Sequence, residues 1–168
     1  MLVQVELDVV RPYTYTAKDT LANYTNYNQP LADPLGAGFV KTIGVARYQP
    51  VRNLTLTLTG TYYIQGVDTG IANFGNTIFN PYTTAAHQYG VSMINGPKSH
   101  CEILSLDVSY QVRRNMFLDI GGTYRKYVNN AGIYNNDYST PGPQTSLTTN
   151  YVYVGIRLNA ARRNFNLY

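Results

Sequence analysis

Seven charged side chains fall at alternate positions of strand-like segments, where they would share one polar surface. They are the carboxylates Glu6, Asp8, Asp107 and Asp119 and the cations Lys41, Arg125 and Arg157. Paired carboxylates are groups that general acid–base catalysis uses. Carboxylates and cations that share a surface more often neutralise each other as ion pairs. We therefore expect an ion-paired lining on this surface, with no catalytic residues.

Two further groups of residues could do chemistry, and each lacks a feature that the chemistry needs. The stretch 90–94, Gly-Val-Ser-Met-Ile, misses the second Gly of a nucleophile elbow, and no strand–turn–helix pattern surrounds Ser92. His87 and the run 100–102 contain metal-ligating types, but three successive strand residues cannot all face one ion. The single Cys101 leaves no internal disulfide. We expect no metal, no cofactor and no enzymatic activity; an enzyme of the outer rim that uses Ser92 or His87 is the alternative.

Six segments in which apolar and polar residues alternate would position these side chains. In the clearest of them, 54–65, Leu and Thr alternate over the first six residues. The other five are 2–13, 38–49, 102–112, 116–127 and 150–160. The alternation is weakest in 38–49, where apolar residues share a face with cations: Phe39, Ile43, Val45, Lys41 and Arg47. At about 10–12 residues each, the segments have the length that a tilted strand needs to cross a bilayer.

The gaps between the segments alternate in length. Long gaps lie at 14–37, 66–101 and 128–149, and short gaps lie at 50–53 and 113–115. Membrane barrels sort their connections in this way, with tight turns on the periplasmic side and long loops outside. A soluble β-sandwich is the alternative, but sandwich strands are nearer to about 5–6 residues. The pattern predicts an all-β fold, an antiparallel transmembrane β-barrel of the bacterial outer membrane, with residues 1–168 in a single domain.

Six strands are too few for a closed membrane barrel, which begins at about eight. Two open edges in lipid would leave unpaired backbone groups, each of them costly. We therefore expect these strands to be the C-terminal part of a larger barrel, with completion of the wall by partner chains as the alternative. Met1 opens directly into a strand pattern, without the regions of a signal peptide. For an exported protein, this predicts that the gene product starts further upstream.

Tyrosine is abundant, at 17 of 168 residues, and tryptophan is absent. Tyr48, Tyr62, Tyr110 and Tyr124 lie near strand ends on the apolar faces. An aromatic ring at that position has its face in lipid and its hydroxyl among the headgroups. The sequence therefore predicts an aromatic girdle from these four residues.

Arginines concentrate at one predicted side of the membrane. They are Arg52, Arg113 and Arg114 in the short gaps and Arg162 and Arg163 in the terminal tail. Such a basic rim suits the phosphate groups of lipid headgroups. The net charge of +4 is modest, and no basic groove with interleaved aromatic residues indicates nucleic acid. Outer-membrane lipid is the expected partner, and nucleic acid is not.

Three stretches in the long gaps are more specific than the alternation. Arg-Pro-Tyr-Thr-Tyr stands at 11–15, after the strand that carries Glu6, and Asn-Tyr-Asn-Gln-Pro-Leu-Ala-Asp-Pro-Leu-Gly-Ala-Gly-Phe stands at 26–39. Asn-Phe-Gly-Asn follows at 73–76. Together these stretches resemble the Wzi-like capsule-assembly outer-membrane barrels and the related gliding-motility protein RemB. Asp33 and Gly38 stand where that family often has His and Asn.

The resemblance implies a non-enzymatic outer-membrane barrel that attaches surface polysaccharide (capsule) or supports adhesion and gliding, with other envelope-complex subunits as further partners. A passive or selective pore is the alternative. Recognition would lie in the outer loops, because aromatic rings stack on sugar faces and Asn amides bond to hydroxyls. The candidate ligand-binding residues are Tyr24, Tyr27, Phe74 and Tyr82. The same residues could instead only plug the barrel mouth.

The assignment of faces in 54–65 gives a matched pair of substitutions. Leu56→Arg would place a charge in lipid near the bilayer midplane, at a cost of roughly 2–4 kcal/mol, and should block membrane assembly. Thr57→Arg would place the same charge on the polar face and should be tolerated. Heat-modifiability on gels measures assembly of both, and equal tolerance would show that the faces are misassigned.

Overall fold

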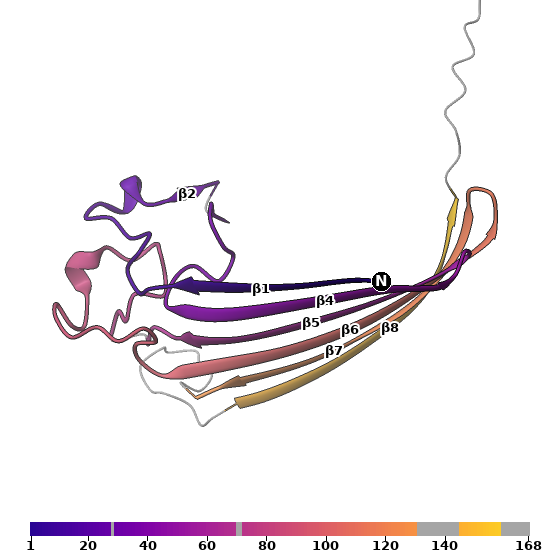
Figure 1. Cartoon of the computed structure of the whole chain (residues 1–168). Helices are drawn as coiled ribbons and strands as arrows, with labels where there is room; N and C mark the ends of the chain where they lie inside the picture. Colours follow the sequence, from indigo (N-terminus) through magenta and orange to yellow (C-terminus); the bar gives the residue numbers. More distant parts are fainter. Residues whose placement is uncertain (28, 70–71, 131–144, 159–168) are drawn as a thin grey trace, which may run out of the picture.

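The computed structural model describes residues 1–27, 29–69, 72–130 and 145–158 (Figure 1). One antiparallel sheet of six long strands dominates this part of the chain, in the order β1-β4-β5-β6-β7-β8. The strands are β1 (Leu2–Val10), β4 (Phe39–Val51), β5 (Leu54–Gly66), β6 (Lys98–Arg113), β7 (Met116–Asn129) and β8 (Thr145–Leu158). The long loops add η1 (Thr20–Ala22), β2 (Thr25–Asn26), β3 (Gln29–Pro30) and η2 (Tyr82–Thr84).

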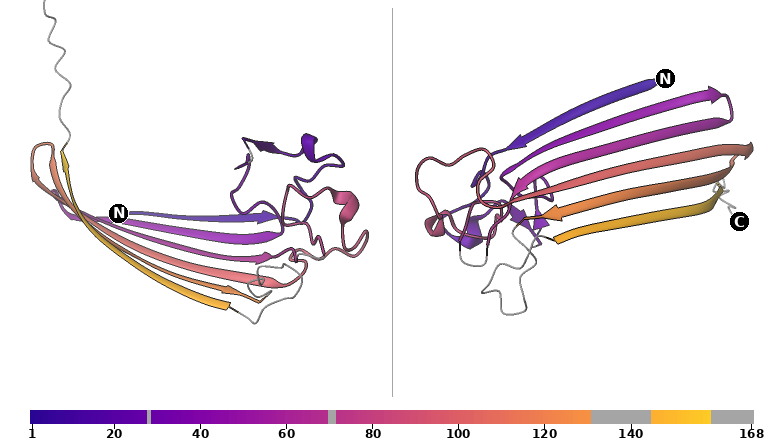
Figure 2. Two further views of the ribbon diagram at one scale, coloured as in Figure 1. Left: turned by 180° about the vertical axis from the view of Figure 1, so that it is seen from behind. Right: turned by 90° about the horizontal axis from the view of Figure 1, so that it is seen from below.

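The predicted all-β fold of six antiparallel strands is confirmed. Every strand pairs with its neighbour in the chain, and the two short turns gather at one end of the sheet, with the long loops at the other (Figure 2). The strands β6 and β8 begin earlier than expected, at Lys98 and Thr145. The expected end of the last strand, 159–160, and the tail arginines Arg162 and Arg163 lie outside the described residues. No helix in the described segments has the length and apolar character to cross a membrane.

The sheet has one apolar and one polar face, because register keeps alternate residues in line across all six strands. In one row, Val3 of β1 aligns through Ala46, Leu58 and Leu106 with Gly122 and then with Val152 of β8. No described segment covers this apolar face: Val5 is 72% exposed and Val154 is 69% exposed. The sheet therefore has no dry core on the side where its apolar residues lie.

Register agrees with the predicted grouping of residues in β4, where three apolar residues share a face with two cations. Phe39, Ile43 and Val45 align with Gln65, Thr61 and Thr59 of β5, so they lie on the polar face together with Lys41 and Arg47. The opposite, apolar face of β4 consists of small and apolar residues and two that carry a hydroxyl: Val40, Thr42, Gly44, Ala46 and Tyr48. This strand has apolar residues on both faces, so its own alternation could not decide which face is which.

The apolar residues of this face form a band, and this apolar band runs obliquely to the rows of residues that register aligns across the strands. Its last apolar residue towards the long loops is Val9 on β1 and Val152 on β8. The row of Val9 reaches Ser146 on β8, so the edge of the band moves six residues along the strands over five strand steps. With about 3.3 Å per residue and about 4.8 Å per step, the slope is about 40°.

The first two long loops fold against each other at the loop end of the sheet. The backbone N–H of Tyr13 donates to the Gly75 carbonyl over 2.9 Å, and that of Ala37 donates to the Asn76 carbonyl over 3.1 Å. Gly75 has φ of +87°, and a Cβ there would lie 2.6 Å from the Tyr13 ring. The three stretches that carried the family resemblance, 11–15, 26–39 and 73–76, therefore meet in space.

Buried apolar side chains are few, and they gather beneath these loops. Among the described residues they are Ala37, Phe39, Ile78 and Cys101, each at most 2% exposed. The Gln65 side chain donates to the carbonyl oxygens of Leu35 and Ala37, which fixes the first loop to the sheet. The small core thus joins the loops to the polar face and leaves the apolar face free.

Candidate functional site

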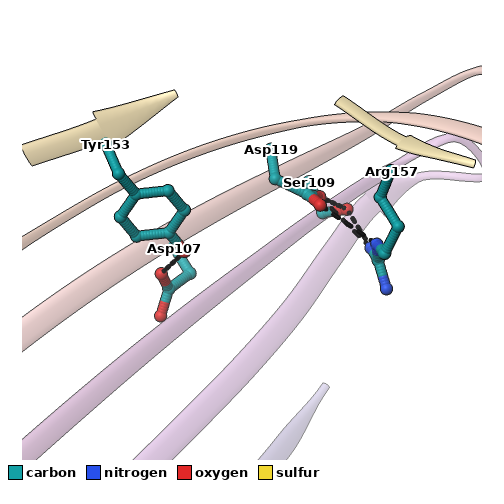
Figure 3. A network of polar contacts seen from close by, with 5 residues as sticks. All are labelled: Asp107, Ser109, Asp119, Tyr153 and Arg157. Atoms are coloured by element: carbon teal, nitrogen blue, oxygen red, sulfur yellow. Dashed lines mark hydrogen bonds and ion pairs between the residues drawn. The ribbon is translucent and has the colours of Figure 1, made fainter. Parts of the chain in front are cut away.

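The polar face carries a network of charges near the turn end of β7 and β8 (Figure 3). Arg157 lies 3.0 Å from the Asp119 carboxylate and also donates to the Ser109 hydroxyl over 3.1 Å. Ser109 in turn donates to Asp119 over 2.5 Å. The Arg157 guanidinium lies 4.7 Å from the centre of the Phe117 ring, which the cation contacts through its face. Asp119 and Arg157 therefore form an ion pair across neighbouring strands, a contact of the kind expected for this surface.

Asp107 bonds to a tyrosine and forms no ion pair with a described residue. The Tyr153 hydroxyl of β8 donates to the Asp107 carboxylate of β6, across the intervening strand β7 (Figure 3). Gly121 of β7 stands between them, in register with both. A Cβ at Gly121 would lie 2.4 Å from the Tyr153 ring and 2.5 Å from the Asp107 carboxylate. The missing side chain is thus what lets the Tyr153 ring lie across β7 and reach Asp107.

A second cluster of charges ties the first long loop to the polar face. Lys41 of β4 lies 3.0 Å from the Asp8 carboxylate of β1 and also pairs with Asp33 from the loop. Asp33 accepts a further bond from the backbone N–H of Leu35 over 2.9 Å, which closes a turn. The loop with β2 rises on the side towards which the turn end of the sheet bends (Figure 1). The polar face is therefore the concave one.

Two of the predicted lining residues do not take part in these ion pairs. Glu6 and Arg125 lie on the polar face in one row of register, but neither forms an ion pair with a described residue. Arg125 instead lies 5.7 Å from the centre of the Tyr127 ring. The described lining is therefore a set of local clusters, at the loop end and at the turn end.

The first two long loops form an open cavity of about 480 Å³. Its wall consists of Tyr13 and of residues from the second long loop: Tyr82, Thr83, Ala85, His87, Gln88 and Val91. The Tyr13 hydroxyl donates to the Asn73 carbonyl over 2.6 Å. Burial, and then the negative charge of Asp68, raise the pKa of the Tyr13 phenol, so it keeps its proton and this bond further into alkaline solution than a free tyrosine would. The cavity combines aromatic rings with hydroxyl, amide and imidazole groups and has the size of a small-molecule site.

The four candidate ligand-binding residues occupy different places. Tyr82 lines the cavity and is 49% exposed. Phe74 lies behind it, half-buried, with its ring 6.4 Å from that of His87. Tyr24 stacks on Tyr15 at 5.5 Å, away from the cavity lining, and Tyr27 is 95% exposed.

Sequence reasoning missed Tyr13 and His87 as lining residues. The stretch 11–15 was noticed for its resemblance to a family, which pointed to the segment and not to the Tyr13 side chain. Only the long-range bonds between Tyr13 and the second loop bring Tyr13 beside Tyr82.

The residues considered for catalysis and metal binding are dispersed. His100 and Cys101 are successive residues of β6 and so lie on opposite faces of the sheet. The Ser92 hydroxyl donates to the Ile94 carbonyl over 2.7 Å. No group of three or more His, Cys, Asp or Glu side chains is placed to hold a metal ion in the part of the chain that the structure describes.

No protein-family model, no curated protein and no solved structure matches the chain. What the chain does must therefore be argued from its own faces, loops and charges.

The contact of Tyr153 with Asp107 predicts unequal effects of two glycine substitutions on the polar face. Gly121→Ala should lower the free energy of unfolding by about 1–3 kcal/mol, because its methyl group displaces the Tyr153 ring. Gly155→Ala should have little effect, since a Cβ there has no atom within 4 Å. Urea unfolding of both variants in detergent measures the difference. Equal stability would mean that the ring does not lie across Gly121.

Proposed function

We propose that the chain is part of the wall of an outer-membrane β-barrel whose outer loops bind surface polysaccharide. The single observation that carries the first half of the proposal is the oblique apolar band on the convex face. Strands of a membrane barrel tilt by about 35–45°, so a horizontal slab of lipid crosses the rows of register at that angle. The slope of about 40° follows from the register and the positions of the apolar residues, and a soluble sheet has no reason to have it.

The band also has the borders that lipid requires. On β7 it extends from Tyr124 to Met116, about 26 Å along the strand, close to the height of the apolar band in membrane barrels before tilt is allowed for. Tyr62 and Tyr124 lie at its loop side, and Tyr48 and Tyr110 lie at its turn side; all four are 41–51% exposed. Beyond Tyr124 the next residue on this face is Lys126. These features support contact with a bilayer, with a girdle of tyrosines at each of its two surfaces.

If lipid follows the oblique band, two residues in the same row of register should differ in their contact with lipid. Val5 and Asn150 align through β4, β5, β6 and β7, yet Val5 lies inside the band and Asn150 lies outside it. Val5→Lys should cost about 2–4 kcal/mol of membrane stability, and Asn150→Lys should cost about 0–1 kcal/mol. The measurement is urea unfolding of each variant in vesicles, followed by gel mobility.

The two variants add the same charge at the same register, so they control for each other. Equal losses would mean that lipid does not follow the oblique band. Equal tolerance would mean that this face does not contact lipid, and the proposal of a membrane wall would be wrong.

The second half of the proposal, recognition of polysaccharide, rests on the loop cavity. The cavity lies at the loop end, which is the outer side in a barrel with short periplasmic turns. Tyr13 and Tyr82 offer aromatic surface for a sugar ring, and Gln88 and Thr83 offer groups that bond to hydroxyls. The three loop stretches that resemble the Wzi-like family build the surroundings of this cavity. Capsule attachment, or adhesion during gliding, is the role that fits such a site.

Substitution of two exposed loop tyrosines tests whether polysaccharide binds in the cavity or elsewhere on the loop surface. Tyr82→Ala should reduce the retention of surface polysaccharide by washed cells several-fold, because it removes a wall of the cavity. Tyr27→Ala should leave retention unchanged, since Tyr27 does not line the cavity. Both variants should assemble normally. Equal retention in both would place recognition elsewhere.

A selective pore is the second candidate, favoured by the charged polar face. The clusters of Asp119 with Arg157 and of Lys41 with Asp8 and Asp33 would line the water-filled side of a barrel. The first loop, bound to Lys41, would narrow that passage at its outer end. Most of these charges neutralise each other, so a strong preference for one ion is not expected. A selective pore is therefore the weaker of the two candidate functions.

A further inference from the structure

The two short turns place three arginines together at one end of the sheet. Arg52 lies in the β4–β5 turn, and Arg113 and Arg114 lie at the β6–β7 turn. The turns are joined directly, because the backbone N–H of Gln111 donates to the Asn53 carbonyl over 2.7 Å. Neighbouring strands are only about 5 Å apart, so the three arginines share one small surface at the turn end of the sheet.

No acidic side chain of the described residues pairs with this cluster. The turn segments 50–53 and 113–115 contain no Asp or Glu. All three arginines are exposed, and none forms an ion pair with a described residue. Asp119, a carboxylate of the same half of the sheet, already accepts bonds from Arg157 and Ser109. The cluster therefore has three positive charges without a described acidic partner. Other acidic residues lie at the opposite end of the sheet, near the loops: Asp8, Asp33, Asp68 and Glu102.

The position of the cluster indicates what would neutralise it. Tyr48 and Tyr110 lie on the turn side of the apolar band, and the arginines follow them within four residues along the chain. In a barrel wall this is the depth of the lipid headgroups. Arg presents a planar fork of donors that matches a phosphate group. We propose that Arg52, Arg113 and Arg114 bind the phosphate of an anionic phospholipid in the leaflet that faces the short turns; this rests on the membrane wall proposed above.

Binding of defined lipids to the full chain tests this site. The protein is held in neutral detergent with equal amounts of phosphatidylglycerol and phosphatidylcholine, and bound lipids are counted by native mass spectrometry. The wild type should prefer phosphatidylglycerol. The variant Arg52→Gln/Arg113→Gln/Arg114→Gln should lose this preference, by about fivefold for each arginine removed.

A second triple variant matches the loss of charge. Lys18→Gln/Lys98→Gln/Lys126→Gln removes three charges from the loop half of the chain and should keep the preference. Heat-modifiability shows whether each variant is folded, and Arg114→Gln alone gives a milder variant if the triple one does not fold. Equal loss in both triple variants would reduce the effect to net charge and overturn the proposal. So would a wild type without preference, or one from which equimolar inorganic phosphate displaces the lipid.

This experiment is independent of the tests of the barrel and of polysaccharide recognition. Its readout is which lipid binds, whereas the Val5 and Asn150 variants report where lipid contacts the wall. Loss of preference in the arginine variant with a normal Val5–Asn150 difference supports both proposals. Absence of preference together with that normal difference would contradict the arginine site alone.

Discussion

Alternation of side chains along paired strands is the constraint on which the whole molecule depends. Because register is kept over six strands, each face of the sheet is continuous, and the two faces meet different surroundings. The convex face is apolar, and no described segment covers it, with Val152 74% exposed. The backbone satisfies its polar groups within the sheet, except at β1 and β8, the edge strands of the described sheet. The lipid contact that we propose would account for this exposed apolar surface.

The polar face carries the side-chain contacts that join the strands to one another and hold the loops on the sheet. Near the turns, Arg157 pairs with Asp119, and Tyr153 reaches Asp107 across Gly121. At the other end, Lys41 and Gln65 hold the first loop against the sheet, and that loop bonds to the second. The cavity lined by Tyr13 and Tyr82 is therefore supported by a chain of contacts that begins on the strands. Recognition at the loops would depend in this way on the same register that builds the wall.

The sequence predicted what depends on local pattern and missed what depends on distant contacts. Alternation and gap length were enough to find six strands and to place Asp119 and Arg157 on one polar face, but not to pair them. The strand β4 gave the weakest pattern because Phe39, Ile43 and Val45 lie on the polar face with Lys41, and pairing with β1 and β5 establishes this arrangement. The start of β6 at Lys98 was missed since its first residues do not alternate. The cavity could not be foreseen, because it is built from bonds between loops about 60 residues apart in the chain.

The central claim, that lipid contacts the convex face along an oblique band, is tested most directly by measuring depth along one row of register. Nitroxide labels at Val5, Leu104 and Asn150 can be compared in vesicles through their accessibility to oxygen and to a water-soluble nickel complex; the native Cys101 is fully buried. The account predicts that Val5 lies deepest, that Leu104 lies near the border, and that Asn150 is in water. Equal depth at all three positions, or equal exposure of all three to the nickel complex, would contradict it.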